Sequence, residues 1–189
     1  PLPLLLQTGY LTIKSSERRF NTTWYRLDFP NQEVSASFNT WLLNAYAGKT
    51  RSEVSNFCQQ LAVAMTDSDI ELLRKALESF FAGIPYDLHH KSESNFQNIF
   101  YVLFRLLGYY ISAESRTSDG RIDAVTQTDK WVYLFEFKLD KDESALAQIK
   151  QKEYFKPYLL SPKRVMLIGV NFDSKTGRLS NWKNEELRK

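Results

Sequence analysis

The sequence predicts an α/β fold in which a mixed central sheet is flanked by helices and is preceded by a small element of hairpin and helices. Residues 10–14 and 24–29 alternate apolar and polar side chains, and residues 34–82 show the apolar spacing of helices. The rest of the chain alternates helical and strand patterns, and its strand 131–137 is apolar on both faces, as a central strand would be. We therefore divide the chain into a hairpin and helical linker element, residues 1–85, and an α/β domain, residues 86–189.

Composition places the chain among folded globular proteins. Of its 189 residues, 43% are hydrophobic and 14% aromatic, which supplies the apolar surface for a packed core. One cysteine excludes an intrachain disulfide framework and a cysteine-rich zinc site, and two adjacent histidines argue against a multi-histidine metal site. No apolar run reaches the ~20 residues of a membrane span. We expect a cytoplasmic protein without a membrane partner, and the net charge of +3 does not by itself predict nucleic-acid binding.

The expected hairpin joins two strands at residues 10–14 and 24–29, because both segments alternate in polarity. The polar stretch between them, residues 15–23, predicts a long turn. Pro30 stops the second strand, since proline has no N–H to donate to a sheet.

Three helices are expected after the hairpin. The first covers residues 34–47, and Gly48 behind it is typical of a C-cap. The second covers residues 52–65, and the third follows directly. Ser68 lies three residues before Glu71, which is the spacing of a capping box at the start of the third helix.

The α/β domain is expected to contain, in order, one helix, three strands, a second helix and a last strand. The three strands should form a meander, and the last strand should lie parallel to strand 131–137 after a right-handed crossover. The tail, residues 180–189, is polar and is expected to fray. The expected bounds are a helix ending at Leu107, strands at 109–115, 120–125 and 131–137, a helix at 143–158 and a strand at 165–170.

Strand 131–137 runs directly into charged residues. Glu136 and Lys138 are two residues apart, so a strand places both on one face. Charges at the end of a buried strand cost free energy unless they find partners. Asp123, on the preceding strand, is a candidate partner. If the strands pair around a turn centred near Thr128, Asp123 lies opposite residue 133 or a few places on, and twist or a bulge would bring it toward Glu136.

Two neighbouring carboxylates favour a divalent cation, because the cation relieves their mutual repulsion. Mg²⁺ prefers oxygen ligands and often uses only one or two protein carboxylates. Asp123 and Glu136 are therefore predicted metal ligands, with the Phe137 carbonyl as a third oxygen. Lys138 would hold or activate a water and stabilise a phosphorane-like charge. Arg116 and Arg121 flank this site and are candidate partners of a substrate phosphate.

Asp123 followed by Glu136-x-Lys138 on the next strand resembles the PD-(D/E)xK nuclease superfamily, although Ile122 stands where the superfamily's name has proline. The order of helices and strands also resembles the superfamily's restriction-endonuclease-like core. The resemblance implies a nuclease that hydrolyses phosphodiester bonds of DNA, with RNA as another substrate, and uses Mg²⁺ or Mn²⁺. Since several members of the superfamily bind without cutting, the alternative is an inactive module that binds nucleic acid or protein.

The resemblance extends to further residues of the site. Gln148 and Tyr154, six apart on the expected helix, resemble the Gln…Tyr signature of RecB-like nucleases, whose side chains face the active site. Glu93 matches an acidic position that approaches the metal in many members, which makes it a further candidate ligand. Its other explanation is a first-turn carboxylate favoured by the helix dipole.

Two longer runs are similar to a bacterial group in which a nuclease-like domain follows an AAA-ATPase-like domain. The first run is Gly-Arg-Ile-Asp at residues 120–123, and the second is Phe-Glu-Phe-Lys-Leu-Asp at residues 135–140. Residues 6–13 and 30–34 resemble the segment that joins the two domains in that group. The resemblance implies an N-terminal AAA-ATPase-like domain in the same full-length chain. Residues 1–85 would then pack against it and expose apolar surface in its absence.

Overall fold

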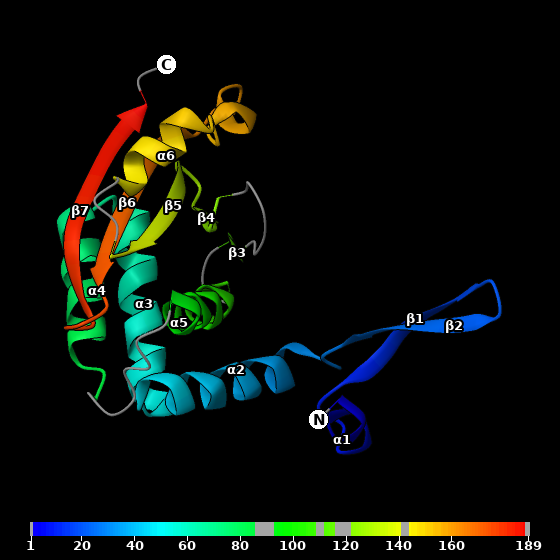
Figure 1. The fold of residues 1–189 in the computed structure, drawn as a ribbon. Helices are drawn as coiled ribbons and strands as arrows, with labels where there is room; N and C mark the ends of the chain where they lie inside the picture. Colours follow the sequence, from blue (N-terminus) through cyan, green and yellow to red (C-terminus); the bar gives the residue numbers. More distant parts are fainter. Residues whose placement is uncertain (1, 86–92, 109–111, 116–121, 141–143, 188–189) are drawn as a thin grey trace.

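The computed structural model describes residues 2–85, 93–108, 112–115, 122–140 and 144–187, and no side chains within 93–97 or 112–115. Its centre is a five-stranded sheet in the order β3-β4-β5-β6-β7, with α3, α4 and α5 on one face and α6 on the other (Figure 1). The elements are α1 (Leu2–Gln7), β1 (Thr12–Arg19), β2 (Thr22–Asp28), α2 (Gln32–Ala47), α3 (Arg51–Asp67), α4 (Ile70–Ala82), α5 (Glu93–Leu107), β3 (Ser112–Ser115), β4 (Ala124–Gln127), β5 (Trp131–Leu139), α6 (Ala145–Gln151), a short 3-10 helix (Lys156–Tyr158), β6 (Arg164–Asp173) and β7 (Arg178–Leu187).

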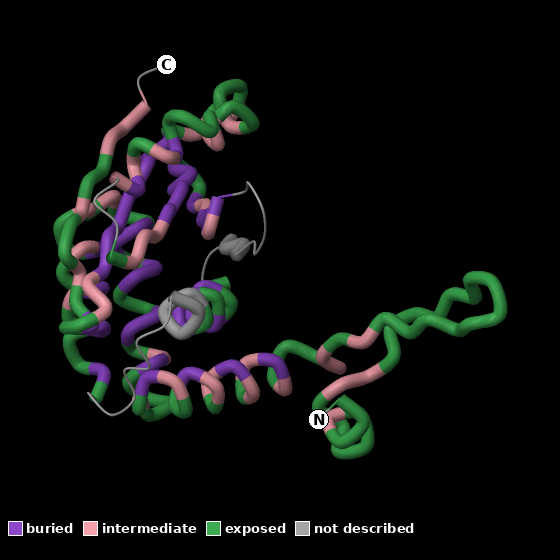
Figure 2. Tube along the Cα trace, in the orientation of Figure 1, coloured by how far each residue is buried: buried purple, intermediate pink, exposed green. Residues whose placement is uncertain are grey.

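The hairpin of β1 and β2 projects from the rest of the molecule and is exposed along nearly its whole length (Figure 2). The expectation of a long turn at residues 15–23 is wrong, because the ladder continues to the pair Arg19 and Thr22. Only Phe20 and Asn21 form the turn. Polar side chains fit this ladder because neither face of the hairpin is buried, so no apolar alternation is required.

The caps of the helices match the sequence in part. Gly48 is the C-cap of α2, as predicted, with a left-handed φ of 65°. Ser68, predicted to begin α4, instead ends α3 with φ 62°. Asp69 begins α4, and its side chain accepts a hydrogen bond from the backbone N–H of Leu72. The carboxylate next to the helix therefore takes the N-cap position, which aspartate fills as well as serine does.

The central sheet is mixed. β3 and β4 pair antiparallel, as do β4 and β5, whereas β5 and β6 are parallel, as predicted. The expectation of a frayed tail is wrong for residues 180–187, because β7 pairs antiparallel with β6 from Val165 to Asp173. β6 is buried on both faces, so its backbone groups need partners on both sides. β7 is a largely polar edge strand, and its composition hid it from the sequence analysis.

Residues of β5 alternate between the two faces of the sheet. Tyr133 and Phe135 join the large cluster formed with α2, α3, α4 and α5, whereas Val132 and Leu134 join a smaller cluster with Ile149 of α6. The Tyr133 hydroxyl also donates a 2.6 Å hydrogen bond to the Met65 carbonyl of α3. One hydrophobic cluster therefore connects the helices before residue 85 with the sheet, and the division into two domains at that residue stays a prediction. Within the described residues, no helix has both the length and the apolar character needed to cross a membrane.

Candidate active site

Asp123, Glu136 and Lys138 come together on the α6 face of the sheet. Ala124 pairs with Phe135, so Asp123, one residue before β4, comes level with Glu136 on the neighbouring strand. The Asp123 carboxylate accepts a 2.8 Å hydrogen bond from the backbone N–H of Phe137. The regular register of β4 and β5 is enough to bring Asp123 to Glu136, and no twist or bulge is needed. β4 runs over Ala124–Gln127 rather than the predicted 120–125. The turn closes later than expected, with the Thr128 N–H donating to the carbonyl of Trp131.

Glu136 is only 3% exposed, although it carries an ionisable carboxyl group. Its Oε1 accepts a hydrogen bond from the Gln148 side-chain amide and lies 3.8 Å from the Lys138 Nζ. Its Oε2 is buried and has no hydrogen-bond partner among the described residues. Burial, and then the negative charge of Asp123, raise the pKa of Glu136 to about 8, against the opposing effects of Lys138 and Gln148. Without a cation, burial and Asp123 therefore favour the protonated form of this carboxyl group.

Helix α6 reaches this site because β6 has a glycine beside Glu136. Gly169 pairs with Glu136, and a Cβ atom at position 169 would lie 2.2 Å from the backbone nitrogen of Leu146. Asn171, which pairs with Lys138, accepts a 3.4 Å hydrogen bond from the Ala145 N–H at the start of α6. The first turn of α6 is thereby held directly on the sheet. Sequence reasoning missed both residues, and glycine inside a buried strand was the available signal.

Gln148 and Tyr154 both lie at the site, but they do not share one helix. The predicted helix over 143–158 is wrong, because α6 ends at Gln151 and Glu153 takes a left-handed φ of 53°. Pro157 explains the break, since its ring would clash with the carbonyl of residue 153 in a continuous helix. Burial raises the pKa of Tyr154, a hydrogen bond to Gln148 lowers it, and the charges of Glu136 and Asp123 raise it.

For three predicted site residues the structure gives no side-chain position. Arg116 and Arg121 lie outside the described residues. Glu93 is the first residue of α5, but the description does not extend to its side chain. The roles of all three stay predictions.

The donor set fits a hard divalent cation. Within the described residues, no group of three or more Asp, Glu, His or Cys side chains is placed to hold a metal. Asp123 and Glu136 provide two carboxylates, and the orphaned Glu136 Oε2 is a buried oxygen that a cation would satisfy. The Phe137 carbonyl remains the predicted third oxygen.

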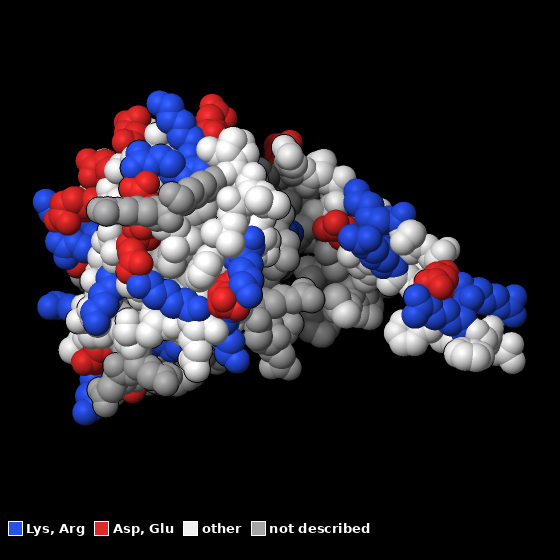
Figure 3. All heavy atoms as spheres, turned by 90° about the horizontal axis from the view of Figure 1, so that it is seen from above, with Lys and Arg blue, Asp and Glu red and all other residues white. Residues whose placement is uncertain are grey.

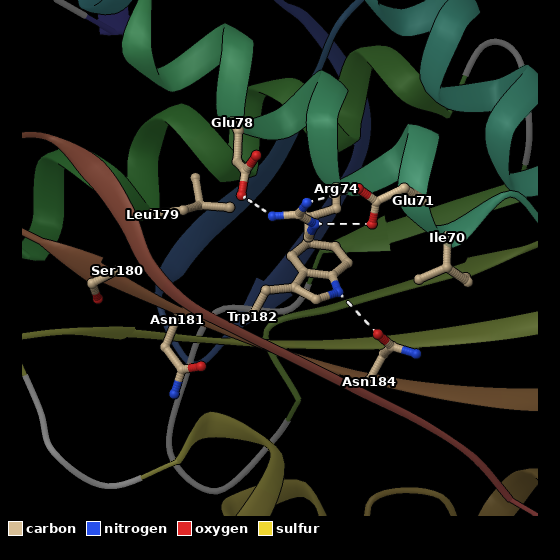
Figure 4. A pocket seen from close by; sticks show the side chains of 9 residues that line it. All are labelled: Ile70, Glu71, Arg74, Glu78, Leu179, Ser180, Asn181, Trp182 and Asn184. Carbon is tan, nitrogen blue, oxygen red and sulfur yellow. Dashed lines mark hydrogen bonds and ion pairs between the residues drawn. The ribbon is translucent and has the colours of Figure 1, made fainter.

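A pocket of about 410 Å³ lies elsewhere, between α4 and β7 (Figure 4). Arg74 crosses its wall and forms ion pairs of 2.7 Å with Glu71 and 2.6 Å with Glu78. The Trp182 indole N–H donates to the Asn184 side chain at 3.1 Å. None of the predicted site residues that the structure describes lines this pocket, so it is separate from the carboxylate site.

Comparisons with known proteins agree with the geometry. A family model described as the PD-(D/E)XK nuclease superfamily matches residues 91–182. An uncharacterized protein in the vnfD 5' region of Azotobacter chroococcum mcd 1 is 37% identical over 177 residues, which cover 89% of this chain. The chain spans about a third (34%) of the length of that relative. No solved structure matches the chain significantly.

The matched residues contain all five of the predicted site residues that the structure brings together. They begin just before α5 and extend to Trp182 in β7, so they include β3 to β6 and the first half of β7. The family model of the PD-(D/E)XK nuclease superfamily thus matches the part of the chain that carries the candidate site.

Proposed function

We propose that this protein is a metal-dependent nuclease that hydrolyses phosphodiester bonds of DNA, with RNA as the alternative substrate. The observation that carries the proposal is the buried, unpartnered Oε2 of Glu136 close to the Asp123 carboxylate. Enzymes of this superfamily generally use divalent metals such as Mg²⁺. Asp123, Glu136 and the Phe137 carbonyl would hold Mg²⁺ or Mn²⁺, with Glu93 as a further candidate. The bound ion would supply positive charge to a phosphate oxygen of the substrate.

Lys138 is the candidate for positioning the attacking water. Its side chain is 12% exposed and lies on the same face as Glu136, so its ammonium group is partly shielded from solvent. In that place it would donate a hydrogen bond to the water and stabilise the charge of a phosphorane-like transition state. Gln148 and Tyr154 would hold the Glu136 carboxyl group in place, and Arg116 and Arg121 would bind substrate phosphates.

A nuclease assay tests the proposal directly. With Mg²⁺ or Mn²⁺, we expect Asp123→Ala and Lys138→Ala each to reduce cleavage by roughly a hundredfold or more. Lys175→Ala, which removes an exposed lysine outside the site, is the matched control and should cleave normally. Unchanged cleavage in both site variants would remove these residues from the mechanism. Binding without cleavage in every divalent ion would favour the inactive binding module instead.

We also propose that an AAA-ATPase-like domain precedes these residues in the full-length chain and contacts α1. This helix has no buried residue and presents Leu2, Leu4 and Leu6 without any charged side chain. Such a surface is suited to protein rather than nucleic acid. Hydrogen exchange checks this: amides of α1 should exchange more slowly in the full-length protein than in residues 1–189 alone. Equal rates would argue against the contact.

A further inference from the structure

The projecting hairpin of β1 and β2 offers a second functional surface. It lies away from the sheet and the helices, and its two faces are both open (Figures 1 and 2). A two-stranded hairpin alone is only marginally stable in water. Large apolar side chains are nevertheless exposed on it, among them Phe20, Trp24 and Tyr25. Exposed apolar surface of this kind marks a binding site.

The register of the hairpin assigns these side chains to its faces. Trp24 pairs with Glu17, so it shares one face with Arg26, two residues further along the strand. Tyr25 pairs with Ser16 and shares the opposite face with Arg18. One face therefore presents Trp24 with Arg26, and also Arg19. The other face presents Tyr25 with Arg18.

The charge of the hairpin is basic. Residues 12–28 contain four basic side chains, Lys14, Arg18, Arg19 and Arg26, against the two acidic residues Glu17 and Asp28. Figure 3 shows lysine and arginine side chains gathered on the projecting arm. Arg19 forms a 2.8 Å ion pair with Glu17. In the described part of the chain, Arg18 and Arg26 have no ion pair, so both guanidinium groups are available to a ligand.

Phe20, at the tip, is unfavourable in two independent ways. Its side chain is 99% exposed, and its φ of 55° is a left-handed conformation that bulky residues rarely adopt. Asparagine or glycine would suit such a turn better. Neither the packing nor the turn explains a phenylalanine here, whereas stacking on a ligand would.

We propose that the hairpin is a nucleic-acid-binding arm. Arg18 and Arg26 would contact phosphates, and the rings of Phe20, Trp24 and Tyr25 would stack on bases. Arginine next to exposed aromatic rings is the combination that binds the charged backbone and flat bases of nucleic acid. The uncharged leucines of α1, by contrast, are suited to a protein. The choice of nucleic acid as the ligand rests on the proposed nuclease function, but binding by the arm does not require cleavage.

Binding to a fluorescein-labelled oligodeoxynucleotide, single-stranded and as a duplex, tests the arm. Fluorescence anisotropy is measured with EDTA present, so that no metal-dependent cleavage occurs. Phe20→Asn removes the ring but keeps a residue that tolerates positive φ, so the turn should persist and the Tm should not fall. We expect affinity to drop roughly 5- to 150-fold, as stacking on an aromatic ring implies. Leu160→Asn is the control, because Leu160 is equally exposed, at 99%, outside the arm.

The arginines are tested by salt dependence. Arg18→Gln and Arg26→Gln should each reduce the slope of log K against log salt concentration by about 0.7 for a single strand or about 0.9 for a duplex. Arg178→Gln, an exposed arginine outside the arm, is the matched control and should leave the slope unchanged. The nucleic-acid form with the larger loss of affinity in Phe20→Asn identifies the preferred ligand.

Two outcomes would overturn the proposal that the hairpin binds nucleic acid. One is unchanged affinity and salt slope in all three arm variants. The other is unchanged oligonucleotide binding together with a change in oligomeric state by light scattering, which would make the hairpin a protein interface. If the arm variants weaken binding but no divalent ion supports cleavage, the arm stands and the nuclease proposal fails. If the protein cleaves and the arm variants bind normally, the nuclease proposal stands and the arm proposal fails.

Discussion

The two faces of β5 differ although their residues alternate along a single strand. Toward α5, Phe137 continues an aromatic layer, and its ring stacks on Phe100 with centroids 3.7 Å apart. Toward α6, Glu136 and Lys138 interrupt the apolar surface, and Gln148 of α6 contacts Glu136. A close-packed interior resists small displacements. The aromatic face therefore fixes the strand, and the opposite face can carry charged groups in defined positions.

The largest effect is expected from the aromatic face. Phe135 is fully buried, and its ring lies 5.1 Å from that of Phe104, centroid to centroid. Phe135→Ala should lower the free energy of unfolding by about 3–5 kcal/mol, because it removes packing and leaves a cavity. Denaturant unfolding measures this, with the exposed Phe20→Ala as control at within about 0.5 kcal/mol. A loss below about 1 kcal/mol would mean that the aromatic layer does not anchor the strand.

A smaller effect is expected where α6 touches the sheet. Gly169→Ala places a Cβ atom against the backbone of Leu146, which cannot move like a flexible side chain. We expect a loss of about 1–3 kcal/mol in the free energy of unfolding. Cleavage should fall as well, because α6 carries Gln148 to Glu136. Ala147→Ser, on the exposed side of α6, is the control; equal stability of the two variants would show that the close approach is unimportant.

Glu136→Gln separates a waiting metal ligand from a structural ion pair. In the metal-free protein at pH 7, we expect this variant to be as stable as the wild type or more stable, because glutamine keeps the shape of the side chain and removes a carboxyl group whose ionisation is opposed by burial and by Asp123. Thermal unfolding in EDTA makes the comparison. A loss above ~2 kcal/mol, as when a buried ionic network is broken, would instead mean that Glu136 and Lys138 form a structural pair.

The raised pKa of Glu136 also predicts how the stability of the metal-free protein changes with pH. The pKa of Glu136 in the folded protein, about 8, lies above the ordinary value of 4.5, so folding favours the protonated carboxyl. This contribution to stability is fully present below pH 4.5 and is lost as the pH rises through 8. The wild type should therefore lose stability relative to Glu136→Gln between these limits when metal is absent. Parallel curves for the two proteins would show that the pKa is not raised.

The smallest effect is expected at an exposed ion pair on the same helix. Lys150 of α6 pairs with Glu185 of β7, and both side chains are nearly half exposed. Such pairs contribute less than about 1 kcal/mol because water and salt screen them. Lys150→Ala should therefore change the midpoint of denaturant unfolding only slightly, and a change as large as that of Gly169→Ala would show that this pair holds α6 in place.

Local patterns predicted the part of the site that lies on one strand. The apolar run before Glu136 and Lys138 identifies a buried strand, and the alternation of a strand places both side chains on one face. Gln148 came from the family resemblance, and the structure places it on Glu136. Gly169 and Asn171 were missed because their importance arises from contact with α6, about 25 residues away along the chain. Glycine inside the buried strand was the available local signal, but it does not identify the helix that approaches.

The fold differs from the prediction where the residues of a strand are polar, because their polarity does not reveal a buried face. Residues 15–23 of the hairpin and β7 are polar, the first exposed on both faces and the second at a sheet edge, so neither shows the expected apolar alternation. The break after α6 had a visible signal in Pro157. Helices α2 to α5 were predicted most reliably, because their apolar faces contribute to the large cluster and their spacing is regular.

The position of β7 has a consequence for how the polypeptide matures. β6 carries Gly169 and Asn171, and its outer edge pairs with β7, residues 178–187. Of the described strands, β7 is synthesised last. A product shortened by a premature stop or by proteolysis before Arg178 would contain the nuclease motif yet display the bare edge of an apolar strand. Such edges recruit other chains. We expect shortened products to aggregate rather than to persist as folded monomers.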